Sequence, residues 1–470
     1  MNAGQPAGSP QRGWRTWAAV TLLVLGVYLA YATHFAGRVA LPVHPNGLGT
    51  YDALAEALLD GRTDLRMTPA DPRVQDIRFD LSVYQDRYYL YWGVAPAALL
   101  YAPYRAVFGR GLPDAWAAFA FLFGTYLLGS VLLLRIHSSR YHTLGQRSLG
   151  ATLAVLGLAN LSLYMLKQAR IYEVAASGGL FFFIAGLCLL AHWRLDRART
   201  AIADETGAGK LALASLCFGL SLLTRPTHAV AIAMLIALTG MYLWRGEDHR
   251  RGARLAWLAT PAAICFGLWC FYNWSRFGQP LETGQSLAQN GLPTQKFYVL
   301  SVFRGFYLQL LQPPLLSPQP PFIRSLGMDA VARALTFGLP GYAWNSIGLW
   351  FMAPFVLILP VAVPRAIRAL RQARGAPASA GDDALGFIKL TLGTSLAATL
   401  FVLLCFAYSD LRYTADYLST ALLLSALAWF GHLERAAGQA PRRGLAPTKV
   451  MTLAVVWSIV VNVVVGFFLL

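Results

Sequence analysis

Charged residues are scarce in this sequence of 470 residues. Only 13% of the chain is Asp, Glu, Lys or Arg, against roughly a quarter in an ordinary soluble domain, while 56% is hydrophobic. So little charge cannot cover the surface of a water-exposed globule. The composition therefore excludes a soluble enzyme, including one that is held at a membrane by a single anchor.

Cysteine and internal repetition are also limited. The sequence has no repeat of about 20 to 50 residues, and its net charge of +17 is not gathered in a basic, aromatic-interleaved soluble module. Nucleic acid is therefore not an expected partner. The five cysteines all fall inside apolar runs, so neither a disulfide framework nor a thiolate metal site is predicted; they are Cys188, Cys217, Cys265, Cys270 and Cys405.

Long apolar runs are what the sequence has in abundance. A helix of about 20 residues crosses a bilayer core of about 30 Å, and such runs recur from residue 14 to residue 470. They predict an all-α fold, a polytopic transmembrane helix bundle with the lipid bilayer as its solvent. About eleven spans are expected, near residues 15–34, 114–134, 148–166, 174–193, 211–224, 227–244, 255–274, 343–363, 386–407, 417–432 and 450–469.

The distribution of basic residues indicates the orientation of these spans. With the N-terminus inside, the inner segments carry 22 of the 39 Lys and Arg residues and eight of the 22 acids, which is the excess of positive charge expected on the cytoplasmic side. Residues 91–108 are apolar, but a span there would place Arg135 and Arg147 outside. This stretch is therefore expected to lie on or partly in the outer membrane face. The expected location is the bacterial inner (cytoplasmic) membrane of the cell envelope, with the C-terminus outside.

Two outer segments are too long to be simple connectors within the single integral membrane domain expected for residues 1–470. The first (periplasmic) loop, 35–113, carries eight of the 22 acids. Its residues 51–59 have the spacing of an amphipathic helix. The second loop, 275–342, is rich in proline and aromatic residues, which favours extended, rigid chain. Function is expected to concentrate in such loops.

Charged residues at the outer ends of spans are the other functional candidates, because charge at membrane depth is costly. Four short stretches qualify, and all lie on the same face as the acidic loop: 167–173, 224–228, 272–284 and 408–417. Their common sidedness favours a single outer active site. Each has a structural alternative: Arg225 can bind lipid phosphate at the interface, Arg412 can form an ion pair with Asp410 or Asp416, and the loop acids can simply be solvated.

These stretches resemble motifs of the GT-C superfamily of lipid-phosphate-sugar-dependent glycosyltransferases, with the closest likeness to its bacterial, protein-mannosyltransferase-like membrane branch. The resemblance implies a long first outer loop with helices along the membrane, and transfer of a sugar from a polyprenyl-phosphate donor to a glycan, lipid or protein acceptor at the outer face. The matching pieces span most of the chain: 51–61, 84–96 with Pro103 and Tyr104, Thr224-Arg-Pro226, Arg276-Phe-Gly278 with Glu282 and Gly284, and 412–417.

The resemblance also implies roles for individual residues. A carboxylate early in the first loop serves as general base on the acceptor hydroxyl, and Arg, Lys or a divalent metal (Mg²⁺ or Mn²⁺) stabilises the departing phosphate. No acid occurs in residues 44–50, where the family base commonly sits, so Asp52 is the first candidate and Asp80 the second. No metal ligands are assigned. The residues expected to bind substrate are Arg225, Arg276, Glu282, Arg412, Asp416, Tyr89 and Trp92, the three arginines at the donor phosphate. For Tyr89 and Trp92, which would contact sugar or lipid, an interfacial aromatic belt is the alternative.

Two other functions stay open at this stage. A transporter or flippase for lipid-linked saccharides would place polar residues within spans and often shows inverted repeats; no such repeat is found, and mid-span polar residues such as Asn160 look isolated. The second alternative is a non-catalytic GT-C relative that binds a lipid-linked sugar or a partner protein. The missing loop acid favours that alternative.

Overall fold

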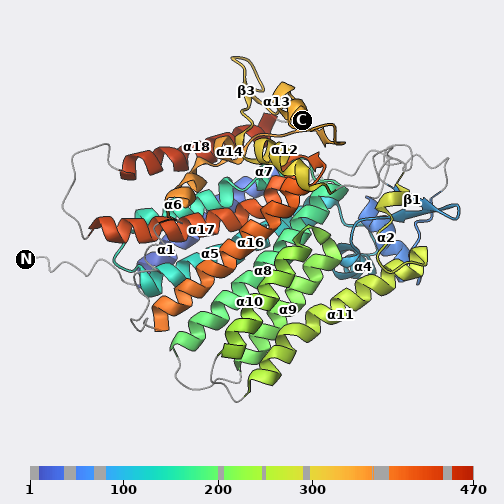
Figure 1. Ribbon diagram of the computed structural model, residues 1–470, viewed down its shortest axis with the longest axis horizontal. Coiled ribbons are helices and arrows are strands. Elements are labelled where there is room, and N and C mark those ends of the chain that lie inside the picture. Colours follow the sequence, from blue (N-terminus) through green and yellow to red (C-terminus); the bar gives the residue numbers. More distant parts are fainter. Residues whose placement is uncertain are drawn as a thin grey trace, which may run out of the picture.

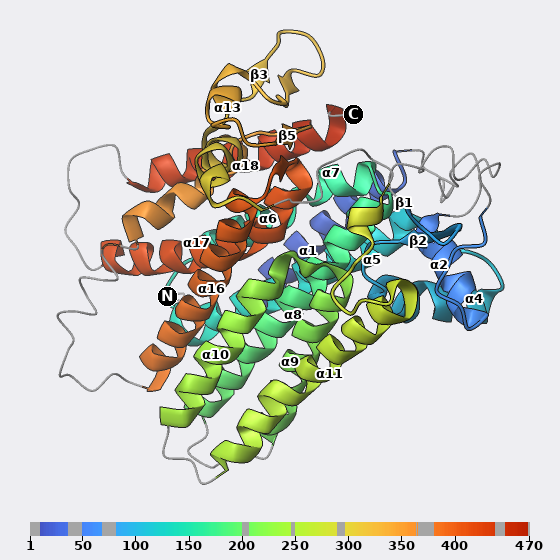
Figure 2. The same cartoon turned by 45° about the vertical axis from the view of Figure 1, so that its right-hand side comes forward.

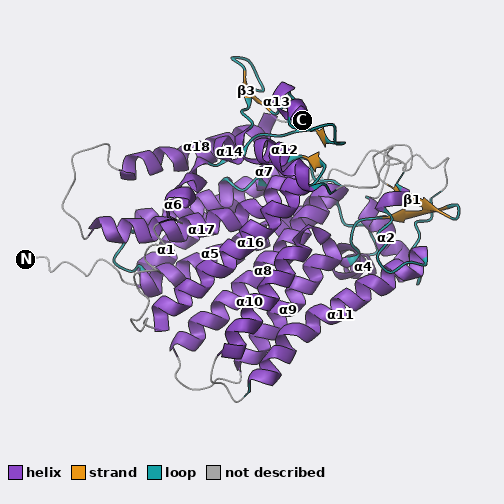
Figure 3. Cartoon of the chain, viewed as in Figure 1, coloured by secondary structure: helices purple, strands orange, loops and turns teal. Residues whose placement is uncertain are grey.

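The structure is a computed structural model that describes residues 10–35, 49–67, 81–199, 206–245, 250–288, 297–362, 364, 380–437 and 447–468. Helices dominate, and the described strands form three two-stranded sheets (Figures 1 and 3). The predicted all-α, polytopic helix bundle is confirmed, and the chain is a multi-pass membrane protein.

Nine helices in the described part of the chain are long and apolar enough to cross a membrane. The predicted number of eleven spans is therefore too high by this criterion. The nine spans are formed by α1 (Pro10–Ala32), α5 (Asp114–Arg140), α6 (Gln146–Leu158) continued by α7 (Ser162–Lys167), α8 (Ile171–Arg199), α9 (Thr206–Thr224), α10 (Ala229–Arg245), α11 (Arg251–Phe277), α16 (Ala380–Cys405) and α18 (Pro447–Phe468).

The two remaining predicted spans depart from the prediction for different physical reasons. Residues 417–432 lie within a long helix, α17 (Leu411–Ala437), most of which is buried, but this helix is not among those apolar enough to count as a span. Residues 343–363 are interrupted: the short helix α14 (Leu349–Met352) ends before Ala353, and η7 (Pro354–Leu357) leads into helical residues 358–362. Ala353 between them has φ −144° and ψ 69°, which no helix allows.

The helices surround α8, which packs against α5, α9, α16 and α17 (Figures 1 and 2). Helix α11 lies at the outside of this bundle and packs mainly against α9. The apolar face of α11 that does not contact α9 is exposed, as expected where lipid is the surrounding solvent.

One asparagine on the last helix joins two interrupted spans. The Oδ1 of Asn462 accepts a hydrogen bond from the backbone N–H of Leu161, at 3.0 Å, where α6 gives way to α7. Its Nδ2 donates to the carbonyl of Met352, at 2.9 Å, where α14 ends. Asn160 is part of the same junction, because its Oδ1 accepts from the N–H of Ser162 at 3.1 Å. The prediction that Asn160 is isolated is therefore wrong: it caps a helix break.

The first outer loop packs against the outer end of the bundle. It contains α2 (Thr50–Leu59), the antiparallel strands β1 (Leu81–Tyr84) and β2 (Arg87–Leu90), the π-helical turn η2 (Ala97–Tyr101) and α4 (Ala102–Phe108). The helix predicted for residues 51–59 is confirmed as α2, although most of its residues are buried. Together η2 and α4 are too short to cross a bilayer.

The second outer loop lies against the outer ends of α16 and α18. The N–H of Tyr298 donates to the carbonyl of Cys405 at 2.9 Å, and residues 312–321 contain no helix, in agreement with the proline-rich sequence. Its elements are η4 (Gln285–Leu287), η5 (Val299–Ser301), α12 (Val302–Phe306), η6 (Tyr307–Leu311), β3 (Leu315–Leu316), β4 (Ile323–Arg324), α13 (Ala330–Ala334) and β5 (Tyr342–Ala343), which pairs with β6 (Tyr408–Ser409).

Candidate active site at the outer ends of the helices

The first loop touches the bundle at Gly93. The N–H of Gly93 donates to the carbonyl of Thr224 at 3.2 Å, at the end of α9. A Cβ atom at position 93 would lie 2.0 Å from the carbonyl oxygen of Leu223, so only glycine permits this approach. The contact joins the segment that holds Trp92 to the segment that holds Arg225, although 131 positions of sequence separate the two residues that hydrogen-bond here.

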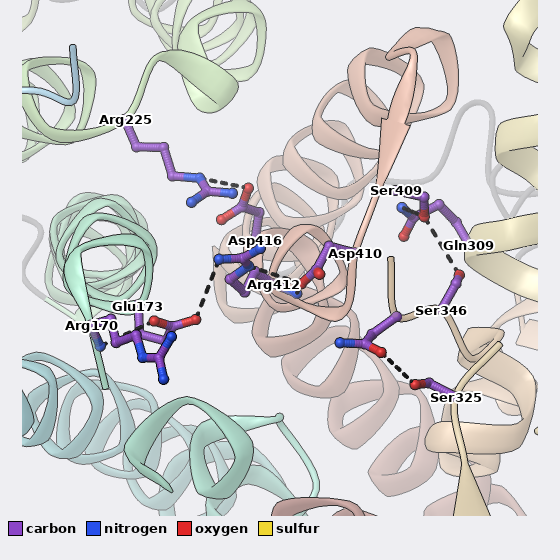
Figure 4. Close-up of polar contacts among 11 residues, drawn as sticks. Arg170, Glu173, Arg225, Gln309, Ser325, Ser346, Ser409, Asp410, Arg412 and Asp416 are labelled. Atoms are coloured by element: carbon purple, nitrogen blue, oxygen red, sulfur yellow. Dashed lines mark hydrogen bonds and ion pairs between the residues drawn. The ribbon is translucent and has the colours of Figure 1, made fainter. Parts of the chain in front are cut away.

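Arg225 forms a buried ion pair with Asp416 of α17 (Figure 4). Its Nε donates to the Asp416 Oδ2 at 3.0 Å, and the two side chains are 8% and 0% exposed. The Arg225 guanidinium also lies over the ring of Tyr413, 5.3 Å from its centre. The Arg225 Nη2 and the Asp416 Oδ1 are buried without a hydrogen-bond partner. Buried polar atoms are normally satisfied, so this pair has the means to bind a further polar group.

Arg412, one turn before Asp416, meets two carboxylates (Figure 4). Its Nε donates to the Asp410 Oδ1 at 2.9 Å, and its Nη1 lies 3.6 Å from the Glu173 Oε1. The Glu173 Oε2 accepts from the backbone N–H of Arg170 at 3.1 Å. One guanidinium therefore faces two buried carboxyl groups.

Aromatic rings connect these two ion clusters to the first loop. The rings of Tyr91 and Trp92 stack with centres 3.7 Å apart, and Trp92 makes an edge contact with Tyr172 at 5.0 Å. The guanidinium of Arg412 lies over Tyr172, 4.3 Å from its centre. Tyr172 precedes Glu173 at the start of α8, so the aromatic contacts end beside the carboxylates.

Asp52 lies in the first turn of α2 and is completely buried. The Arg105 Nη1 of α4 donates to the Asp52 Oδ2 at 2.8 Å, and the Arg105 Nη2 donates to Glu56 at 3.1 Å. Burial raises the pKa of the Asp52 carboxyl above its usual value, and the charge of Arg105 partly offsets this rise. A carboxylate held in this way is a stronger base than a solvated one.

Tyr51 connects the Asp52 region to Arg225. Burial raises the pKa of the Tyr51 phenol well above its usual value; Asp114 acts in the same direction and the charge of Arg225 in the opposite one. The Tyr51 Oη is buried without a hydrogen-bond partner. The ring of Tyr51 lies 5.7 Å from that of Tyr101, whose hydroxyl donates to the Asp114 Oδ1 at 2.5 Å. The π-helical turn η2 places Tyr101 in this interior position.

Three of the predicted substrate-binding residues make contacts within the chain. The Arg276 Nη1 donates to the carbonyl of Leu90 at 2.6 Å, which fastens the end of β2 to the end of α11. The Glu282 carboxylate accepts from the N–H of Gly284, also at 2.6 Å, and closes its own turn. Tyr89 is buried against Phe277. These contacts position the first loop on the bundle.

The structure thus gathers Arg225, Asp416, Arg412 and Trp92 at one end of the helix bundle, which is predicted to be the outer end, and Asp52 lies on α2 of the first loop. The second candidate base, Asp80, lies outside the described residues. Over the ranges that are described, no group of three or more His, Cys, Asp or Glu side chains is arranged to hold a metal ion. The carboxylates nearest the site already face guanidinium groups, so they do not fit a resident divalent ion, and no step is derived through one.

Sequence reasoning missed several residues of this region. Glu173 stood in a candidate stretch without an assigned role, and Arg105, Asp114 and Tyr172 were not singled out. A carboxylate at the first position of a span, such as Asp114 directly after Pro113, is a signal that could have been used. The partner of Arg105 could not be found from sequence, because 53 residues separate it from Asp52.

Comparison with solved structures identifies the fold. No protein-family model and no curated protein matches the sequence. The Archaeoglobus fulgidus oligosaccharyltransferase in its apo form is 12% identical and aligns over 96% of this chain and 55% of its own, with a TM-score of 0.51. The same enzyme tethered to an acceptor peptide is 13% identical, with the same coverage and a TM-score of 0.50.

A third solved structure is ArnT from Cupriavidus metallidurans bound to undecaprenyl phosphate. It is 13% identical and aligns over 97% of this chain and 75% of its own, with a TM-score of 0.42. The present chain spans about half the length of the oligosaccharyltransferase that it matches. The likeness confirms the predicted resemblance at the level of fold: the chain has the fold of GT-C superfamily membrane glycosyltransferases.

Proposed function

We propose that this chain, with its GT-C fold, is a membrane glycosyltransferase that moves a sugar from a polyprenyl-phosphate donor to a glycan, lipid or protein acceptor at the outer face of the bacterial inner membrane. The observation that carries the proposal is the buried Arg225–Asp416 pair, which keeps one guanidinium nitrogen without a partner at the outer ends of the spans. A lipid-linked phosphate is the anion that is available at this depth.

The phosphate would be bound chiefly by Arg225. Its Nη2 is a charged donor in a dry environment, where a hydrogen bond to an ionised oxygen is strong, and the unpaired Tyr51 Oη acts as a second donor. Arg412 and Arg276 serve the phosphate less well, since Arg412 faces two carboxylates and Arg276 binds backbone carbonyls. Of the three predicted phosphate ligands, we retain Arg225.

Asp52 would act as general base. In the proposed step its carboxylate accepts the proton of the acceptor hydroxyl, the hydroxyl oxygen bonds to the anomeric carbon, and the bond from that carbon to the phosphate oxygen breaks. The electron pair of the broken bond stays on the phosphate beside Arg225, which stabilises the added charge. Attack from the side opposite to the phosphate inverts the anomeric carbon. Asp80 remains the second candidate for the base.

The decisive experiment measures sugar release and transfer from radiolabelled polyprenyl-phosphate sugars by purified protein in lipid. Asp52→Asn is expected to lower kcat by about 10²- to 10⁴-fold, the usual contribution of a positioned base, while donor binding is retained. Asp382→Asn, at an exposed position in the first turn of α16, is the matched control for loss of a carboxylate. Wild-type protein that binds the donors but turns over none of a broad panel contradicts the proposal.

The same experiment separates two alternatives, each of which has a specific observation in its favour. The broken spans at Leu161 and Met352 are a feature of transporters for lipid-linked saccharides. The absence of an acid in residues 44–50 favours a non-catalytic binding protein. Donor movement across a bilayer without sugar release would identify the transporter, and donor binding alone would identify the binding protein.

A further inference from the structure

A half-buried aromatic surface borders the phosphate site and has no role in the steps proposed above. It consists of Tyr91, Trp92 and Tyr172, joined by the stacked and edge contacts at 3.7 Å and 5.0 Å. Aromatic faces bind the C–H faces of sugar rings, and polar groups at their edge bind the hydroxyls. Arg412 and Glu173 supply such polar groups at the Tyr172 end.

The position of this surface relative to Arg225 fits one glycosyl phosphate. Gly93 and Thr224, which hydrogen-bond to each other, are the sequence neighbours of Trp92 and Arg225, so the two residues belong to segments that meet here. Arg412 and Asp416 are four residues apart on α17, so their Cβ atoms lie about 5–6 Å apart, which is close to the span from a phosphate to the far side of an attached hexose. A phosphate on Arg225 therefore places its sugar over the aromatic surface, next to Arg412.

The charge of the sugar end restricts what it can bind. The Asp410 and Glu173 side chains are 2% and 3% exposed, and both carboxyl groups lie within ion-pair distance of the Arg412 guanidinium. The cluster therefore sets two buried carboxyl groups against one guanidinium, in a setting where charges are weakly screened. A carboxylate on the sugar would face two buried carboxylates, whereas a hydroxyl or an ammonium group would find acceptors.

We propose that Tyr91, Trp92 and Tyr172, with Arg412, Asp410 and Glu173, form the donor-sugar subsite and select a sugar that carries no acidic group. This inference rests on the proposed function and adds the class of sugar to it. The two carboxylates discriminate by repulsion, which is a common route to specificity. The aromatic rings supply contact area common to all hexoses.

Binding of three purified lipids to the protein in nanodiscs tests the inference: bare polyprenyl phosphate, its glucose phosphodiester and its glucuronic acid phosphodiester. The two phosphodiesters share one phosphate charge, so they differ only in the sugar. Wild-type protein is expected to bind the glucose lipid at least about tenfold more tightly than the glucuronic acid lipid. Glu173→Gln is expected to reduce this ratio toward one.

A second variant covers the case in which Glu173→Gln fails to fold. Trp92→Ala is expected to weaken the binding of both phosphodiesters by about tenfold and to leave the binding of bare polyprenyl phosphate unchanged. Trp257→Ala, at an exposed position on the inner half of α11, is the control. Equal binding of the two phosphodiesters by wild-type protein, or no effect of Trp92→Ala, overturns the sugar subsite alone. Failure of wild-type protein to bind any of the three lipids overturns the proposed function as well.

Discussion

Arg225 and Asp416 are 191 residues apart in the sequence, yet the Arg225 Nε donates to the Asp416 Oδ2 at 3.0 Å in the interior of the protein. Each side chain keeps one buried polar atom without a partner. A purely structural ion pair would satisfy both groups, because removing charges from water is otherwise costly. The Arg225 Nη2 and the Asp416 Oδ1 are therefore available to bind a further polar group.

Removal of one member of this pair is expected to destabilise the protein more than removal of both. Asp416→Leu leaves a buried guanidinium unpaired and should lower the free energy of unfolding by about 3–5 kcal/mol. The double variant Arg225→Met with Asp416→Leu should recover most of this stability, while donor binding is lost. Thermal unfolding in detergent, together with donor binding, measures both effects. A double variant that still binds polyprenyl phosphate would remove Arg225 from the site.

Arg225→Lys probes the shape of the cation at constant charge. Lysine cannot keep the Nε bond to Asp416 and offer a second nitrogen in the same plane. We expect a loss of about 10- to 100-fold in kcat/KM, the value of one charged hydrogen bond. Arg333→Lys on α13 is the matched control. Unchanged kinetics for Arg225→Lys would show that a point charge suffices.

The raised pKa of Asp52 predicts the acid limb of the pH profile. A base must be ionised, so kcat/KM should rise with pH through a value above the usual aspartate pKa of about 4 and level off above it. Arg105→Met removes the charge that favours the ionised form, so the limb should move to higher pH. Steady-state kinetics between about pH 4 and pH 8 measures the shift. A limb that stays in place in Arg105→Met would assign the base to another residue.

Gly93→Ala tests the approach of the first loop to the bundle. The added Cβ would meet the carbonyl oxygen of Leu223 at 2.0 Å, so the loop must move away and take Trp92 with it. Overpacking of this kind costs about 1–3 kcal/mol of folding free energy. Activity should fall further than this loss of stability alone explains, because Trp92 moves. Gly267→Ala in α11 is the control, since a Cβ there meets nothing within 4 Å. Full activity in Gly93→Ala would show that the contact is dispensable.

Asn462→Leu is expected to loosen the two interrupted spans. It leaves the N–H of Leu161 and the carbonyl of Met352 without their partner, and each unsatisfied buried group costs about 1–3 kcal/mol. The melting temperature in detergent should drop, whereas Val460→Ala on the exposed side of α18 should change it little. An unaltered melting temperature in Asn462→Leu would mean that other groups or water satisfy these atoms.

The sequence by itself determined the membrane location, the helical class and most spans, because crossing a bilayer requires a local property, about 20 consecutive apolar residues. It also pointed to Arg225, Arg412 and Asp416, since charge beside a span is expensive and therefore conspicuous. The span at 343–363 was predicted as one continuous helix because its composition is apolar. The structure interrupts it at Ala353, beside the Met352 carbonyl that Asn462 binds from more than a hundred residues later.

Only the tertiary structure decided which charges meet. Arg412 pairs with Glu173 on α8, and Asp52 pairs with Arg105 on α4. Neither pairing follows from spacing, because residues far apart in the chain come together only when helices pack side by side. The sidedness of each residue is a local matter of charge and hydropathy, whereas its partner is fixed by the packing of the whole bundle. That difference explains why the gathering of the charged span ends could be predicted and their ion pairs could not.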